Sequence, residues 1–240
     1  MWETTLVGKP NDLVYFLDLK NNLKNIFGQN ALVVITFEKD LICSIALVSD
    51  KQIYQAKSLI YETIIKIVKV EYLTENLKVL INDKSLNSYF VSSIVSIEIA
   101  DEVKFAMQTT KLTNCINIRS FVNFKLHQFF EIWGREVDYY NFHFATEDKG
   151  NYLDFLKFLA NNINPKSEIM YLEERSNEML ILDQKRKKLK LLSKNDDVGI
   201  IANLVMLAPK KLIINCIDAL SEKVTNLISY IFEDRVSVLL

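Results

Sequence analysis

The sequence is short of the two residues that most often break a chain into turns. Its 240 residues include 5 glycines and 3 prolines, half of them are hydrophobic, and the formal net charge is −1. Collagen-like and low-complexity chains need far more glycine and proline, and a disordered chain has fewer apolar residues and a larger net charge. What remains is a globular protein made mostly of long helices, in one large domain or two small ones.

Reactive side chains are also scarce. The three cysteines, Cys43, Cys115 and Cys216, lie far apart beside apolar residues, which is typical of buried or half-buried free thiols. His127 and His143 are the only histidines, and two ligands do not complete a transition-metal site. We therefore expect His127 to be partly buried or at the surface and His143 to pack among aromatic rings.

The motifs that carry common chemistries are missing. The glycines are isolated, so there is neither a dinucleotide-binding fingerprint nor a Walker A loop, and no nucleophile elbow or His-Glu-x-x-His helix occurs. Neighbouring acidic residues point in different directions, so acidic doublets are interpreted as caps and solvated faces. We assign no catalytic, cofactor-binding or metal-binding residue. The doublets are Asp101-Glu102, Glu147-Asp148, Glu173-Glu174 and Asp196-Asp197.

Nothing in the sequence indicates a targeting or membrane-spanning segment. The first residues, 1–5, lack the basic and apolar regions of a signal peptide, and the longest apolar stretches, 41–48 and 199–209, fall short of the roughly 20 residues that span a bilayer. We expect a cytoplasmic protein without a membrane span. The bias toward Lys, Asn and Ile, with 24 Lys against 5 Arg, reflects AT-rich codons and indicates a low-GC bacterium.

The hydrophobic pattern predicts an α+β fold in three segments. Residues 1–50 read as strand (2–7), helix begun by Asn11 or Asp12 and ended by Gly28, and two hairpin strands (31–37 and 41–48). Residues 51–165 form a mainly helical central body, and residues 166–240 add a mixed sheet carrying two helices.

Four helices are expected in the central body. The first places Ile53, Ala56, Ile60, Ile64 and Ile67 on one face, with Lys69 among the polar residues outside that stripe. The second opens at Ser85 with a stripe too broad for a surface helix. The third begins at Asn117 and continues past residue 137, and the fourth spans 152–163. The third helix turns these residues inward: Ile118, Phe121, Val122, Leu126, Phe129, Phe130, Trp133 and Val137.

The C-terminal segment alternates between the two periodicities. Strands are expected at 168–174 and 178–183 around a turn at 175–177, with a short third strand at 189–192. A helix then runs from Asp196-Asp197 to Leu207, followed by a strand at 212–215, a helix at 219–232 and a strand at 236–239.

The strongest charge feature is a basic run, in which five of six residues are cationic: Lys185, Arg186, Lys187, Lys188 and Lys190. Two interpretations are open. The run is either a contact to nucleic acid or anionic lipid, or a solvated turn balanced by Glu173, Glu174, Glu178 and Asp183 on the neighbouring hairpin.

Ten aromatic residues lie between 121 and 152, and one helix cannot bury them all on one stripe. Phe124 lies off the face set by Phe121 and Val122. Either the helix is central and packed on both sides, or Phe124 belongs to a partner-binding patch, since aromatic rings anchor interfaces.

Four segments together resemble a known family. They are IRSFVNFKL at 118–126, YLDFLKFL at 152–159, LVMLAPKKLII at 204–214 and IFEDRV at 231–236. Their order and spacing resemble the YtxC-like sporulation proteins of endospore-forming Gram-positive bacteria (Firmicutes). The resemblance covers about residues 115 to 240 and implies a role in sporulation. It supplies no active site to carry over.

These observations favour a non-enzymatic protein that serves sporulation through contacts with an unidentified protein partner. One alternative is a nucleic-acid-binding protein using the basic run with Lys210 and Lys211, which predicts steeply salt-dependent binding. Another is an enzyme whose site is assembled from scattered polar residues, which predicts a deep pocket lined by perturbed ionisable groups. The sequence gives no indication of oligomeric state.

Overall fold

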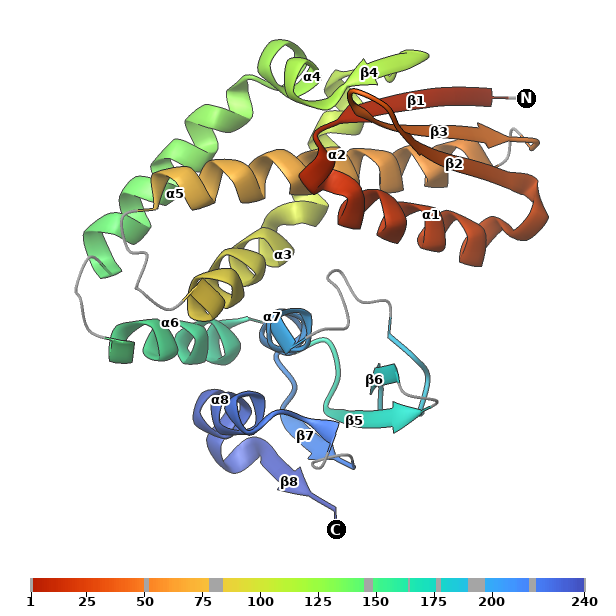
Figure 1. Ribbon diagram of the computed structural model, residues 1–240. Helices are drawn as coiled ribbons and strands as arrows, with labels where there is room; N and C mark the ends of the chain where they lie inside the picture. Colours follow the sequence, from red (N-terminus) through yellow and green to blue (C-terminus); the bar gives the residue numbers. More distant parts are fainter. Residues whose placement is uncertain are drawn as a thin grey trace. The chain divides into compact units, whose positions relative to one another are not determined.

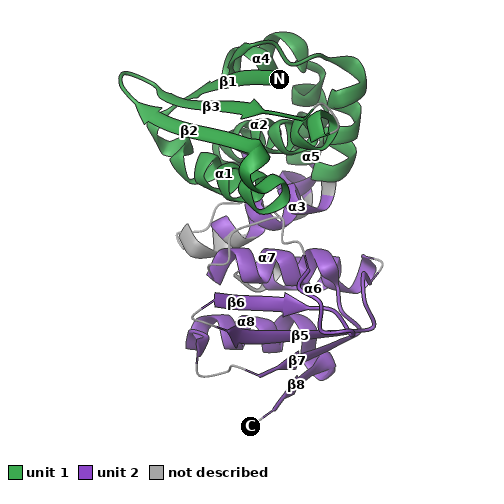
Figure 2. Cartoon of the chain, turned by 90° about the vertical axis from the view of Figure 1, so that its right-hand side faces the viewer, with its two compact units in different colours: residues 1–76, 98–138 green, residues 77–97, 139–240 purple. Residues whose placement is uncertain are grey.

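The computed structural model describes residues 2–49, 52–77, 84–144, 149–163, 165–175, 178–189, 197–215 and 219–239 (Figure 1). The fold is α+β, as predicted, with a mainly helical body and two four-stranded sheets. The chain divides into two compact units (Figure 2). The first comprises Met1–Asn76 and Glu98–Asp138, and the second Leu77–Ile97 and Tyr139–Leu240, so residues of the expected helical segment 51–165 belong to both.

The first unit contains a mixed sheet in the order β2-β3-β1-β4. The predicted strand, helix, strand, strand order is confirmed, and the hairpin strands pair antiparallel over their whole length. The fourth strand, β4, runs parallel to β1 and was not predicted, because three residues are too few to show an alternation. The elements are β1 (Trp2–Gly8), α1 (Leu13–Phe27), β2 (Ala31–Phe37), β3 (Leu41–Leu47) and β4 (Cys115–Asn117).

The ends of α1 differ in how well they follow the prediction. Gly28 ends the helix with a φ of 56°, a backbone conformation that favours glycine. At the other end, a 3₁₀ turn (Pro10–Asp12) precedes α1, and the side chain of Asp12 makes no cap bond to the helix. Its carboxylate instead accepts a hydrogen bond from the backbone N–H of Lys9 at 2.7 Å.

Helix α2 (Ile53–Asn76) buries the expected apolar stripe apart from the half-buried Ile53, but the expectation for Lys69 was wrong. The Lys69 side chain is fully buried, and its Nζ lies 2.7 Å from Glu102 Oε1 and 3.2 Å from Glu136 Oε2. Trp133 Nε1 donates to the same Glu102 oxygen at 2.7 Å. Glu102 belongs to a doublet that we expected to be solvated, and that expectation was also wrong. Buried charges persist when they are paired, and here the partners come from other helices.

The predicted third helix is two helices. Residues Ile118–Lys125 form α4 and Gln128–Phe144 form α5, with the break at Leu126 and His127. Leu126 is fully buried at the break. The expected inward positions are nevertheless buried, apart from the half-buried Phe130, and Trp133 is fully enclosed as predicted. The second helix of the body is α3 (Lys84–Thr109).

The second unit holds the predicted mixed sheet, in the order β6-β5-β7-β8. Strand β6 pairs antiparallel with β5, and β5, β7 and β8 run parallel. Helix α7 is buried along nearly its whole length, which makes it the centre of this unit's core. The elements are α6 (Lys149–Asn162), β5 (Ile169–Arg175), β6 (Glu178–Leu182), α7 (Asp197–Leu207), β7 (Lys211–Ile214), α8 (Glu222–Phe232) and β8 (Val236–Val238).

Two details of the second unit depart from the sequence prediction. Helix α8 begins at Glu222, three residues later than expected, because the Ser221 side chain caps it by accepting from Val224 N. Of the short strand expected at 189–192, only Leu189 is described, and it does not belong to a strand; an isolated bridge joins Leu182 to the preceding residue, Lys188. Among the described residues, no helix is long and apolar enough to cross a bilayer.

Replacing Lys69 with Met should destabilise the protein strongly, because it leaves the buried Glu102 and the half-buried Glu136 without their cation. We expect the free energy of unfolding to fall by about 3–5 kcal/mol. Lys66→Met is the matched control on the same helix. Lys66 pairs with Glu62 at a partly exposed position, 2.8 Å apart, and such a pair contributes about 0.5 kcal/mol. Urea unfolding measures both, and equal losses would contradict the account.

Candidate protein interface on helix α4

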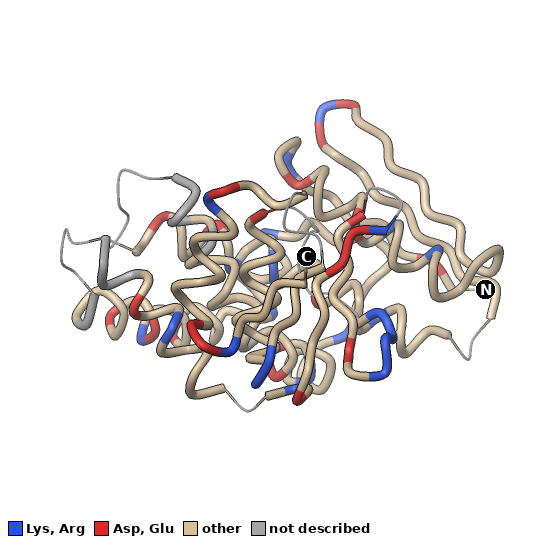
Figure 3. Tube along the Cα trace, turned by 90° about the horizontal axis from the view of Figure 1, so that it is seen from below, with Lys and Arg blue, Asp and Glu red and all other residues tan. Residues whose placement is uncertain are grey.

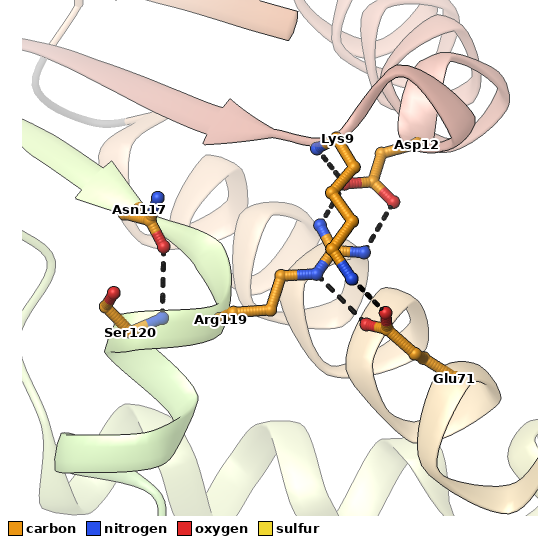
Figure 4. A network of polar contacts seen from close by, with 6 residues as sticks. All are labelled: Lys9, Asp12, Glu71, Asn117, Arg119 and Ser120. Carbon is orange, nitrogen blue, oxygen red and sulfur yellow. Dashed lines mark hydrogen bonds and ion pairs between the residues drawn. The ribbon is translucent and has the colours of Figure 1, made fainter. Parts of the chain in front are cut away.

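Helix α4 has 8 residues, a length at which an isolated helix is not stable in water. Tertiary anchors must therefore hold it. The first is a cap, in which Asn117 Oδ1 accepts a hydrogen bond from Ser120 N at 3.1 Å (Figure 4). The second is the burial of Phe121 and Val122. The third is an ion network around Arg119.

The guanidinium of Arg119 joins three elements of the first unit. Its two terminal nitrogens bind the two carboxylate oxygens of Asp12, with NH2 to Oδ1 at 2.9 Å. Its Nε donates to Glu71 Oε2 at 3.0 Å, and Lys9 Nζ binds the other oxygen of Glu71 (Figure 4). Residues near the start of α1, the end of α2 and the start of α4 thus meet at one side chain. Bidentate pairs of this kind are among the stronger charged contacts because both partners are fixed in orientation.

The Asp12 carboxylate is deeply placed, with 4% of its side chain exposed. This placement requires glycine at position 8, since a Cβ there would lie 2.6 Å from Asp12 Oδ2. Glycine at the last position of β1 is therefore explained by the steric need for space. It makes room for the carboxylate that receives Arg119.

The charges in this network balance one another. Partial burial by itself raises the pKa of Glu71, but Lys9 and Arg119 outweigh burial and hold that pKa below its ordinary value of 4.5. Burial by itself lowers the pKa of Arg119, but Asp12 and Glu71 outweigh burial and raise it. Glu71 and Arg119 are therefore both charged at neutral pH, and the network holds α4 in place through ion pairs.

Phe124 lies on the opposite side of α4 from this anchored face. Its side chain is 79% exposed, whereas Phe121 is 9% exposed. The interpretation of a helix packed on both sides is therefore wrong at Phe124, because no element of the described chain covers it. Asn123, Lys125 and His127 are exposed around it, and no carboxylate occurs in residues 118–130. The result is an apolar ring with a polar, basic rim on a fixed helix. We call this surface the Phe124 surface.

The basic run is partly neutralised by its own hairpin. Asp183 Oδ1 accepts from the backbone N–H groups of Lys185 and Lys187 at 2.8 and 2.9 Å, which closes a turn with Arg186 at a φ of 60°. Arg186 pairs with Glu173 and stacks 3.6 Å from the ring centre of Tyr171.

The lysines in the described part of the run, Lys185, Lys187 and Lys188, are exposed. Lys188 lies 3.6 Å from Glu178, and Lys190 lies outside the described residues. Basic and acidic stretches alternate along the described chain (Figure 3). Glu173 is 7% exposed and also accepts from Arg175 and Asn215, so the expectation that its acidic doublet is solvated was wrong at that residue.

The described cysteines and His127 belong to different parts of the first unit: Cys43 lies on β3, Cys115 on β4 and His127 between α4 and α5. Cys43 is buried, and burial raises the pKa of its thiol to about 12. Cys115 is exposed on β4, which corrects the expectation that it is buried or half-buried. His127 is at the surface, and Cys216 and the side chain of His143 lie outside the description. Within the described ranges, no three His, Cys, Asp or Glu residues are grouped to hold a metal ion.

One open depression of about 260 Å³ lies on the face of the first sheet away from α1. Glu3 is the only ionisable residue among those that line it, so it lacks the group of perturbed ionisable side chains that the enzyme hypothesis predicts. The lining residues are Glu3, Thr4, Thr5, Leu32, Val34, Ser44, Ile45, Ala46 and Asn114.

Comparison with protein-family models, with curated proteins and with solved structures finds no match for this chain. The arrangement around α4 therefore has to be interpreted from its own geometry. Sequence reasoning singled out Phe124 but missed the Arg119 network. Asp12 and Arg119 are 107 positions apart, and no local pattern connects them.

The free energy of unfolding should fall in acid because Glu71 becomes protonated and its ion pairs are lost. Because the folded pKa of Glu71 lies below its ordinary 4.5, the group contributes stability above that value, and this contribution is lost as the pH falls through the folded pKa. Glu71→Gln should therefore make the unfolding free energy fall less steeply between about pH 5 and pH 3. Urea unfolding at stepped pH measures this slope. An unchanged slope in the variant would show that the ion pairs contribute nothing.

Proposed function

We propose that this protein acts by binding another protein, with the Phe124 surface as the contact and Phe124 as its anchor. One observation carries the proposal. A short helix is fixed on one side by a cap, a buried apolar face and a four-residue ion network, while its other side displays a largely exposed phenyl ring. Aromatic anchors of this kind dominate the energy of protein interfaces.

The anchoring reduces the cost of binding. A contact on a mobile segment loses part of its favourable free energy to ordering of that segment, whereas a helix held in advance avoids that loss. Burying a phenylalanine side chain stabilises a complex by about 1.5–3 kcal/mol. Because the Phe124 side chain is largely exposed in the free protein, most of this free energy would be gained on binding.

The chemistry of the rim specifies the kind of partner. Lys125 and His127 flank the ring, and the neighbouring Arg119 is already paired with carboxylates of its own chain. The fitting partner therefore has an apolar pocket wide enough for a phenyl ring, bordered by carboxylates. Charge complementarity at such a rim favours fast and specific association.

The biological context of the proposal is sporulation. It rests on the resemblance of four segments to YtxC-like proteins, and the first of them, residues 118–126, contains α4. A bacterial cytoplasmic location belongs to the same proposal. No residue role is taken from the resemblance, and the role of Phe124 is argued from its exposure.

The proposal is tested by Phe124→Ala in the bacterium that carries this sequence. We expect spore yield to fall toward that of a deletion strain, while the purified variant unfolds at the wild-type temperature. Tyr54→Ala is the matched control, because Tyr54 is 76% exposed on α2 of the same unit, and it should sporulate normally. Protein levels are compared by immunoblot in all strains.

Two outcomes would contradict the proposal at different points. Normal spore yield in the deletion strain would refute the sporulation context. A defect in the deletion strain that Phe124→Ala does not share would refute the role of the Phe124 surface. The charge of the rim is tested by Lys125→Glu, which should reproduce the defect of Phe124→Ala.

A further inference from the structure

The exposed edge of the first sheet is unusual in its composition. Strand β2 forms that edge, and its seven residues, ALVVITF, include no charge, proline or glycine (Figure 1). Natural proteins protect edge strands with charges, proline, bulges or short length, because an open edge pairs with other strands. The pairing of β2 with β3 is continuous from Ala31 to Phe37, so no bulge protects it either.

Exposed apolar side chains are concentrated on the same strand. Leu32 is 65% exposed, Val34 45% and Phe37 62%. Leu32 and Val34 point away from the buried face of the sheet, while Ala31 and Val33 are buried. The opposite edge, β4, has three residues and offers little to pair with. The apolar character of β2 is therefore a property of one edge and not of the whole sheet.

We propose that β2 pairs antiparallel with β2 of a second copy of this chain, about a two-fold axis at Val34. Such a contact is self-complementary, as the interfaces of two-fold dimers are. The sheet that contains β2 in one copy and the same sheet in the second copy then form one continuous sheet. This inference does not depend on the Phe124 surface.

The strand is complementary to itself in this register. Position 34 meets its own copy, Leu32 lies opposite Thr36, and the small Ala31 lies opposite the large exposed Phe37. Because the strand has no charge, no like charges face one another across the axis. The charged hairpin turn meets no like charge of the second copy either, because Glu38 would lie opposite the uncharged Asn30. A strand that bound a charged peptide would instead be expected to carry the opposite charge.

The two-fold axis has a geometric consequence that a cysteine pair can detect. Residues directly opposite in an antiparallel pair have Cα atoms about 4.5–5.5 Å apart, which is within the reach of a disulfide. Two cysteines at position 34 would therefore meet. Two cysteines at position 32 would be four residues out of register, or about 14 Å apart at 3.4 Å per residue, which is too far for a disulfide.

The experiment uses the full chain with Cys115 and Cys216 replaced by serine, leaving the buried Cys43 in place. Under mild oxidation, Val34→Cys should form a disulfide-linked dimer and Leu32→Cys should not. The parent chain should sediment as a dimer at concentrations of about 1–100 µM, and Val34→Lys should raise the dissociation constant at least about tenfold while keeping the wild-type circular dichroism spectrum.

A monomeric parent chain would overturn the proposal, as would a dimer that Val34→Lys leaves unchanged. Equal cross-linking at positions 32 and 34 would refute the two-fold axis at Val34. Open-ended aggregates would refute it too, since pairing at β2 uses up the long edge and closes the assembly at two copies. If β2 instead pairs with an extended segment of a different protein, the purified parent chain would be monomeric, which is the first of these outcomes.

Discussion

The position of helix α4 in the first unit depends on the ion pairs of the Arg119 guanidinium. The guanidinium binds Asp12 and Glu71 at once, and so joins the start of α1, the end of α2 and the start of α4. A helix of 8 residues has too few internal hydrogen bonds to be stable alone. Without these ion pairs α4 would keep its cap and its buried face but would lose the contacts that fix its orientation. A partner of the kind proposed above would therefore meet Phe124 on a helix whose position is already fixed.

A second set of paired charges lies within the core of the same unit. Lys69 is enclosed with Glu102, Glu136 and Trp133, so that one buried cation lies between two carboxylates. Burying ion pairs is costly and does not by itself make a protein more stable than an apolar core would. It does fix which helices can lie together, because any other packing would leave a charge unpaired. The two networks therefore specify the positions of α2, α3, α4 and α5 within residues 1–76 and 98–138.

The elements that the sequence predicted well are those whose evidence is local. The hairpin at residues 31–47 shows two β-branched, apolar runs around a polar turn, and the helices and strands after Pro165 are separated by turn residues, so both patterns were predicted correctly. The missed features all rest on distant partners. The sequence around Lys69 is that of a surface lysine, and its partner Glu102 lies 33 positions away. The sequence around Asp12 is that of a helix cap, and its partner Arg119 lies 107 positions away. The exposure of Phe124 was one of two alternatives, which periodicity alone did not resolve.

Hydrogen exchange on Arg119→Lys tests most directly whether this side chain fixes α4. Lysine keeps the charge but cannot bind both oxygens of Asp12 and also Glu71, because it lacks the planar fork of donors. We predict that the backbone amides of residues 122–125 exchange at least about tenfold faster than in the wild type, with those of β5 in the other unit unchanged. Wild-type exchange rates across α4 in this variant would contradict the account.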